Sequence, residues 1–267
     1  MFVLFFVAML ASVLGTIAGF GGGIFIVPIM VMGFGVPIEG SIGVTALSLF
    51  PASLYSTFHN YRKQAIDVKL LVALEIPTVI GAFVGAQCTR LLPTQPLEMI
   101  FAAFLMILSY KMLKPSSPHS VFNKVISTLN SKKPILKKKD YHVSLWAAGF
   151  FGLLSGVIAG LFGIGGGILK TPVMIKVFNV PVKVATATAL GMIVFTSLSS
   201  GLTHYVVGHV DHVLFLYCGG GFLAGAVIGG KLNVKIKDNS LKKVIAVSIF
   251  LAGLATITHV GAKKWFG

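Results

Sequence analysis

Acidic residues, cysteines and charge in general are scarce in this chain. Its 267 residues include seven Asp and Glu, two cysteines and only 11% charged residues. A soluble domain carries about 25% charged residues, so this composition excludes an ordinary water-soluble domain. The shortage of acids leaves no pair of membrane carboxylates to bind a cation, and two isolated cysteines, Cys88 and Cys218, give neither a disulfide framework nor a metal site.

The net charge of +15 does not indicate nucleic-acid binding. The basic residues lie at the ends of apolar segments and in one linker, and no basic soluble domain carries them together with aromatic side chains. This distribution is typical of residues that set membrane topology.

Apolar residues dominate: 55% of the chain is hydrophobic and the mean hydropathy is +0.91. Several apolar runs approach the roughly 20 residues that cross a lipid bilayer as a helix. A helix is the only open structure that satisfies its own backbone in lipid. We therefore predict an all-α polytopic membrane protein with eight to ten helical segments and no strands.

A glycine-rich motif occurs twice. The stretch GFGGGIFIVP at 19–28 returns as GIGGGILKTP at 163–172, an offset of 144 residues. Each consecutive glycine costs a helix roughly 1 kcal/mol relative to alanine, so the pattern predicts helix, break, helix in both places. A proline suits the first turn of a new helix, and we expect Thr171 to cap the second copy with Pro172 at its first position.

The similarity between the halves extends beyond the glycines. Thr-Ala-Leu at 45–47 and 188–190, Asp67 and Asp211, and Gly-Ala-x-x-Gly at 81–85 and 225–229 also match. We predict a first transmembrane repeat at 1–114, a basic linker at 115–142 and a second repeat at 143–267. Each repeat would comprise one glycine-broken unit and three further spans.

The basic residues indicate how the halves face. If both arms of each glycine-broken unit go in and return, most of the 22 Lys and Arg lie on one side, against Arg90, Lys263 and Lys264 on the other and Lys170 within the membrane. The positive-inside rule then predicts inverted halves with a cytoplasmic linker. Charge does not decide whether the returning arms are re-entrant or cross fully.

The start of the helix after each break is a candidate anion site. Its first backbone N–H groups carry about half a positive charge, and Lys170 lies beside the second one. Alternatively, the glycines only allow close helix packing and Lys170 snorkels to an interface. The predicted substrate-binding residues are Gly21, Gly22, Gly23, Gly165, Gly166, Gly167, Lys170, Thr171, Thr45, Ser48 and Thr188.

The hydroxyl groups in this set, with the nearby Ser197, Ser199 and Ser200, could replace water around an oxyanion or hydrogen-bond helix to helix. Glu75, an acid within an apolar run, is a candidate proton carrier, although it could also lie near a helix end. His59 and His204 could gate or relay protons, or lie at an interface. The loop around His209 has metal-ligand composition but loose spacing, so we predict no metal and no cofactor.

These motifs resemble the sulfite exporter TauE/SafE family, also called the 4-toluene sulfonate uptake permease family. The resemblance rests on two copies of Gly-x-Gly-Gly-Gly followed by Pro, each with its Thr-Ala-Leu and Gly-Ala-x-x-Gly segments. It implies a transporter in the cytoplasmic (inner) membrane of a bacterium or archaeon. The substrates associated with the family are small anions such as sulfite, thiosulfate, sulfoacetate and aryl sulfonates.

The sequence therefore predicts a secondary transporter that moves a small sulfur-containing anion by alternating access around a site at the membrane midplane, without catalysis. An intramembrane lipid-processing enzyme and a transporter of another small ion remain alternatives. The expected partners are the anion and the lipid bilayer, with a homodimer as a further possibility and no nucleic acid.

Overall fold

The computed structural model describes residues 1–113, 134–137, 141–232, 246–247 and 249–258. Most of the linker predicted at 115–142 lies outside these residues.

The described chain is largely helical, which confirms the prediction of an α-helical membrane protein. The first half contains α1 (Phe2–Ala18), α2 (Gly23–Phe34), α3 (Ile38–Arg62), α4 (Val68–Leu91) and α5 (Thr94–Leu113). The second contains α7 (Leu145–Phe162), α8 (Gly167–Lys176), α9 (Val182–Val206), α10 (His212–Lys231) and a helix at Ile249–Thr258. The expectation of no strands is wrong, because β1 (Pro134–Lys137) and β2 (His142–Ser144) pair as an antiparallel ribbon.

Helix length separates the spanning elements from the broken ones. Among the described residues, three helices are long and apolar enough to cross a membrane, namely α4, α9 and α10. At about 1.5 Å per residue, α2 and α8 reach only about 15–18 Å, roughly half of a 30 Å hydrocarbon core. The arms that return from the glycine breaks are therefore too short to cross.

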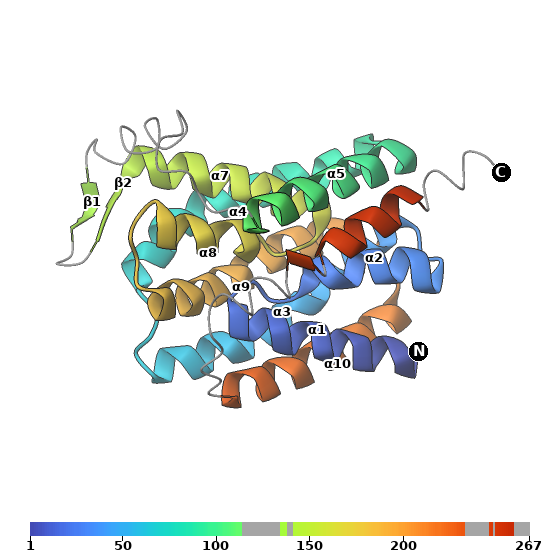
Figure 1. Cartoon of the computed structure of the whole chain (residues 1–267), viewed down its shortest axis with the longest axis horizontal. Helices are drawn as coiled ribbons and strands as arrows, with labels where there is room; N and C mark the ends of the chain where they lie inside the picture. The colour runs from blue at the N-terminus through green and yellow to red at the C-terminus, as the bar shows by residue number, and fades with distance from the viewer. Residues whose placement is uncertain (114–133, 138–140, 233–245, 248, 259–267) are drawn as a thin grey trace.

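The helices pack in pairs that join the two halves. The most extensive contacts are those of α4 with α7 and of α1 with α10, and α3 packs against both α9 and α10. In Figure 1, α1 starts at the end marked N and α7 at the opposite end beside β2, so α2 and α8 lie toward opposite ends of the molecule. Both glycine turns consequently lie inside the bundle.

The glycines of each motif end one helix and begin the next through left-handed backbone. Gly22 and Gly166 are the N-caps of α2 and α8, with φ of 93° and 69°, a conformation open to glycine at little cost. The expected cap is wrong: α8 begins at Gly167, and Thr171 and Pro172 lie inside it. Glycine conformation, and not a side-chain cap, sets where these helices start.

The corresponding helices α3 and α9 show how residues of one half align with those of the other. Both α3 and α9 have 25 residues, and their first residues are Ile38 and Val182, again 144 apart. The Thr-Ala-Leu segments are 143 apart, so Thr45 and Thr188 lie one residue out of step in the two helices. One residue turns a side chain by about 100°, so these two hydroxyls face different neighbours.

Candidate functional site

The two glycine turns meet each other inside the bundle. A Cβ on Gly167 would lie 2.8 Å from Cα of Phe20 and 3.0 Å from the carbonyl oxygen of Gly19. Across the same junction, the Thr171 hydroxyl donates a hydrogen bond to the Gly19 carbonyl at 2.9 Å. The starts of α2 and α8, with their first-turn N–H groups, are thus brought together at one place.

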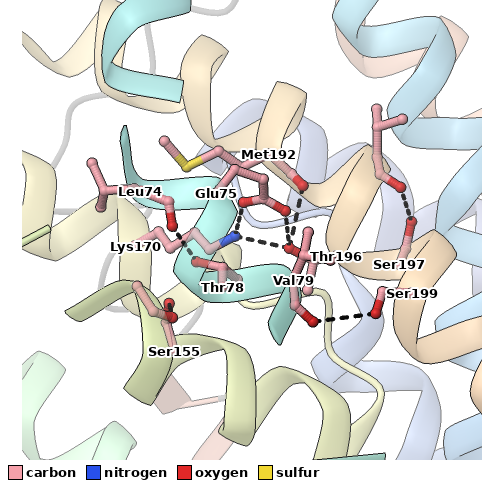
Figure 2. A network of polar contacts seen from close by, with 12 residues as sticks. Leu74, Glu75, Thr78, Val79, Ser155, Lys170, Met192, Thr196, Ser197 and Ser199 are labelled. Atoms are coloured by element: carbon pink, nitrogen blue, oxygen red, sulfur yellow. Dashed lines mark hydrogen bonds and ion pairs between the residues drawn. The ribbon is translucent and has the colours of Figure 1, made fainter. Parts of the chain in front are cut away.

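A buried ion pair lies beside this junction. Lys170, in the first turn of α8, places Nζ 2.6 Å from Oε2 of Glu75 on α4 and 2.9 Å from Oγ1 of Thr196 on α9. The Thr196 hydroxyl donates to the second carboxylate oxygen of Glu75, which closes a three-membered polar network (Figure 2). Lys170 is 1% exposed and Glu75 is 4% exposed.

This geometry joins two residues that the sequence suggested for separate roles. Snorkelling is wrong for Lys170, because its ammonium is buried against Glu75, and Glu75 is not at a helix end. Removing one member of such a pair leaves an uncompensated buried charge, which is strongly unfavourable. In this state the pair is electrically neutral, so Lys170 presents no free positive charge.

The predicted hydroxyls fall into two groups. Thr45 and Ser48 on α3 are fully buried, and neither oxygen has a hydrogen-bond partner among the described residues, although Ser48 lies beside the Cys218 thiol. Thr188 instead accepts a hydrogen bond from the backbone N–H of Asp67 at 3.0 Å. Only the first group retains free polar atoms that a ligand could use.

The two predicted histidines lie in different surroundings. His59 Nε2 is 2.8 Å from the Gly230 carbonyl, and the ring stacks on Tyr55. His204 on α9 is fully buried, with Nε2 3.1 Å from the Gly160 carbonyl and Nδ1 3.2 Å from Nδ1 of His209. Neither ring makes a described contact with Glu75, so the structure does not bring the three coupling candidates together.

One end of the bundle contains a polar cavity of about 1020 Å³, which we call the open end. It is formed where α2 meets α3, α4 meets α5 and α9 meets α10, and its charged and titratable side chains are Glu39, Arg90, His209, Asp211 and His212. Burial lowers the pKa of His209; the Glu39 carboxylate raises this pKa and the Arg90 guanidinium lowers it. His209 is therefore neutral at pH 7.

At the opposite end a buried polar contact joins α4 to the residue that precedes β2, and we call this the closed end. Asp67, the N-cap of α4, is 6% exposed and accepts hydrogen bonds from the Tyr141 hydroxyl and the Leu70 N–H. An apolar cluster around Leu74 and Met192 packs beside them. Sequence reasoning missed this contact, because Tyr141 stands at the end of the polar linker with no signal of its partner.

Thr196 was also missed, although its spacing gave a signal. It stands four residues before Ser200 and eight before His204, a polar row within an apolar helix. Within the described residues, no group of three or more His, Cys, Asp or Glu side chains is placed to hold a metal ion.

The fold and the apolar outer surface define a multi-pass helical membrane protein. The family model of the sulfite exporter TauE/SafE family matches residues 4–256, so the chain belongs to this family of membrane transporters and is not an enzyme. No solved structure matches the chain.

Curated relatives agree with this assignment. The chain is 26% identical to the probable membrane transporter protein YunE of Bacillus subtilis (strain 168), over 96% of each chain. It is 25% identical to the probable membrane transporter protein MJ0441 of Methanocaldococcus jannaschii, over 94% of this chain and 93% of that one. Sulfite exporter TauE/SafE family protein 1 of Arabidopsis thaliana is 34% identical over 42% of this chain and 26% of its own length.

Proposed function

We propose that the protein is a secondary transporter of small sulfur-containing anions, such as sulfite, thiosulfate or sulfonates. The observation that carries this proposal is the buried Lys170–Glu75 pair beside the junction of the two glycine turns. An ionisable pair inside a membrane protein is costly to bury, and such pairs commonly mark substrate or ion pathways. The family name and the scarcity of acids both favour an anion.

The anion would bind to several weak donors at once. The Lys170 ammonium, the first N–H groups of α2 and α8, and the free hydroxyls of Thr45 and Ser48 are the candidates. A sulfonate spreads its charge over three oxygens, which suits such a set. Weak multiple contacts also let the substrate leave, which transport requires.

Glu75 would control when Lys170 is available. As a carboxylate it occupies the ammonium and repels an incoming anion. As a neutral acid it would leave the Lys170 charge to the substrate. Proton uptake by Glu75 and anion binding by Lys170 would therefore favour each other.

The two ends of the bundle would provide alternating access. We propose that the halves are inverted repeats in the cytoplasmic membrane of a prokaryote, with the linker at 115–142 in the cytoplasm. The present structure, with a cavity at one end and a buried Asp67–Tyr141 contact at the other, would be the outward-facing state. A reporter in the linker tests this orientation, and the particle mass in detergent tests for a homodimer.

Anion uptake by purified protein in liposomes tests the function. The panel is sulfite, thiosulfate, sulfoacetate and 4-toluenesulfonate. Three proteins are compared: the natural chain, the double variant Lys170→Met/Glu75→Gln, and Lys183→Met, which removes an exposed lysine at the start of α9. The double variant removes both buried charges together, so that no unpaired charge stays behind.

We expect saturable uptake of at least one anion by the natural chain and by Lys183→Met. The double variant should remain folded and lose uptake. Equal uptake by all three would move the anion site away from Lys170. No uptake of any panel member under any gradient would overturn the proposed substrate class.

A further inference from the structure

A row of buried polar side chains runs along one face of α9. Thr196, Ser200 and His204 are spaced four residues apart, so they lie on the same face of the helix. Their exposed fractions are 0%, 1% and 0%. The Ser200 hydroxyl, in the middle of the row, has no hydrogen-bond partner within the part of the chain that the structure describes. A buried hydroxyl without a partner is unfavourable and requires an explanation.

The row connects the ion pair with the open end. At one end the Thr196 hydroxyl donates to Oε1 of Glu75. At the other end His204 Nδ1 lies 3.2 Å from Nδ1 of His209, and His209 lines the cavity. The row therefore starts at water-accessible polar groups and ends at a buried carboxylate.

The hydrogen-bond partners fix the direction of each bond at the histidine pair. The Gly160 carbonyl can only accept, so His204 Nε2 carries a hydrogen. In neutral His204, Nδ1 is then an acceptor, and His209 donates from its own Nδ1–H. In this arrangement His209 is the donor and His204 the acceptor, so a proton can move inward from His209 to His204.

We propose that this row is a proton path from the open-end cavity to Glu75, which makes anion transport proton-coupled. The inference rests on the proposed function and adds the coupling ion and its route. A proton binds His209 on its second nitrogen, and the hydrogen on Nδ1 moves to Nδ1 of His204. His204 then releases the hydrogen on Nε2, which leaves the Gly160 carbonyl and moves towards the Ser200 hydroxyl. The Ser200 hydroxyl accepts this proton and donates its own towards Thr196. Thr196 passes its hydroxyl hydrogen to Oε1 of Glu75 and is reprotonated from Ser200.

The spacing requires water in two places. One helical turn separates successive members by about 6 Å, which is too far for a direct hydrogen bond and suits one bridging water. The net change is one proton moved from the cavity to the Glu75 carboxylate. Each histidine is left with its hydrogen on the other ring nitrogen, and proton exchange with water along the row resets the starting tautomers before the next cycle. Neutral Glu75 then leaves Lys170 to the anion, so one proton accompanies each anion.

Among the residues that the structure describes, few charged groups lie around the path. Glu75 faces Lys170 from α8, and its other polar contact, Thr196 of α9, does not titrate. His209 shares its cavity with Glu39, Arg90, Asp211 and His212, from α3, α4 and the start of α10. These groups make the cavity polar enough to hold water and deliver protons.

The corresponding row in α3 does not form a path. The positions 144 residues earlier are Ala52, Ser56 and Asn60. Ser56 donates to the Ala52 carbonyl at 3.0 Å, and Asn60 donates to the Ser56 carbonyl at 2.9 Å. Both polar groups are thus satisfied within their own helix. Ser56 supplies a matched control for Ser200: the same residue type and depth, without the route.

The test measures proton and anion movement together in liposomes that contain a pH-sensitive dye. The probes are thiosulfate and 4-toluenesulfonate, which do not themselves exchange protons near pH 7. The natural protein, Ser200→Ala and Ser56→Ala are compared, each checked by thermal unfolding. We expect one proton per anion in the natural protein, a fall of roughly tenfold in proton-coupled uptake for Ser200→Ala, and no change for Ser56→Ala.

The outcomes separate this inference from the proposed function. Anion uptake by the natural protein without proton movement would overturn the proton path and keep the anion transporter. Equal coupled uptake by the two serine variants would also overturn the path. If neither probe is taken up while sulfite and sulfoacetate also fail, the proposed function is overturned, and this inference with it.

Discussion

Corresponding positions in the two halves carry very different chemistry. Lys170, Glu75 and Thr196 form the buried polar network, whereas the positions related by 144 residues are Ile26, Gly219 and Ala52. All three of these counterparts are buried and carry no polar side-chain atom. The glycine turns and helix bounds are duplicated, but the charges are not. The repeated helices and turns thus form a common scaffold. Only one of the two sets of corresponding positions carries polar side chains.

The largest expected effect comes from removing one charge of the pair. Glu75→Leu leaves the Lys170 ammonium buried with Thr196 alone, and unpairing a buried charge costs about 3–5 kcal/mol of folding stability. Ile26→Met, at the position corresponding to Lys170, exchanges apolar groups of similar volume and should cost less than about 1.5 kcal/mol. Reversible unfolding in detergent measures both variants.

A second combination sharpens the same comparison. Adding Lys170→Met to Glu75→Leu removes both charges and should restore most of the lost stability, since replacing a whole buried pair by apolar groups is often neutral. If Glu75→Leu and Ile26→Met destabilise the protein equally, the ion pair does not distinguish the polar network from the corresponding apolar positions.

The sequence predicted the scaffold better than the site. Glycine breaks, helical spans and the candidates Lys170 and Glu75 follow from local composition, because each depends on neighbours within a few residues. The pairing of Lys170 with Glu75 does not, since 95 residues separate them and only the packing of α8 and α4 against α9 brings them together. The register of the Thr-Ala-Leu segments was missed for a related reason. A difference of one residue is small in an alignment, but it points a helical side chain elsewhere.

The two ends of the bundle also carry corresponding residues in different surroundings. A variant with a smaller expected effect tests this second difference. Asp67 and Asp211 both cap helices, but Asp67 is buried against Tyr141 whereas Asp211 lines the cavity. Tyr141→Phe removes one donor to a buried carboxylate, which costs about 1–3 kcal/mol and should open the closed end roughly tenfold more often.

Thiol labelling measures this opening. The native cysteines Cys88 and Cys218 are first removed. A cysteine then replaces Ala185, a fully buried residue of the apolar cluster at the closed end. The rate at which a water-soluble maleimide labels this cysteine is measured. We expect faster labelling with Tyr141→Phe than without it. A cysteine at Val210, in the cavity wall, should react quickly in both backgrounds. An unchanged rate at 185 would show that Tyr141 does not hold this end closed.

The smallest expected effect is a change in pH dependence at the outer end of the polar row, which exists in α9 and not in α3. Burial holds the pKa of His209 below its ordinary value of 6.5, so this ring gains a proton only as the external pH falls below that value. Uptake in the natural protein should therefore rise with acidification through this range and fall as pH rises through the lowered pKa. His209→Gln should flatten the profile without abolishing uptake, because cavity water can then take the place of the His209 ring beside His204. The pH profile is measured as initial uptake rates at external pH 5 to 8 and a fixed internal pH. His59→Gln, in the first half, is the control, because His59 lies against Gly230 and away from the row. A profile that flattens equally in both variants, or in neither, would remove His209 from the path.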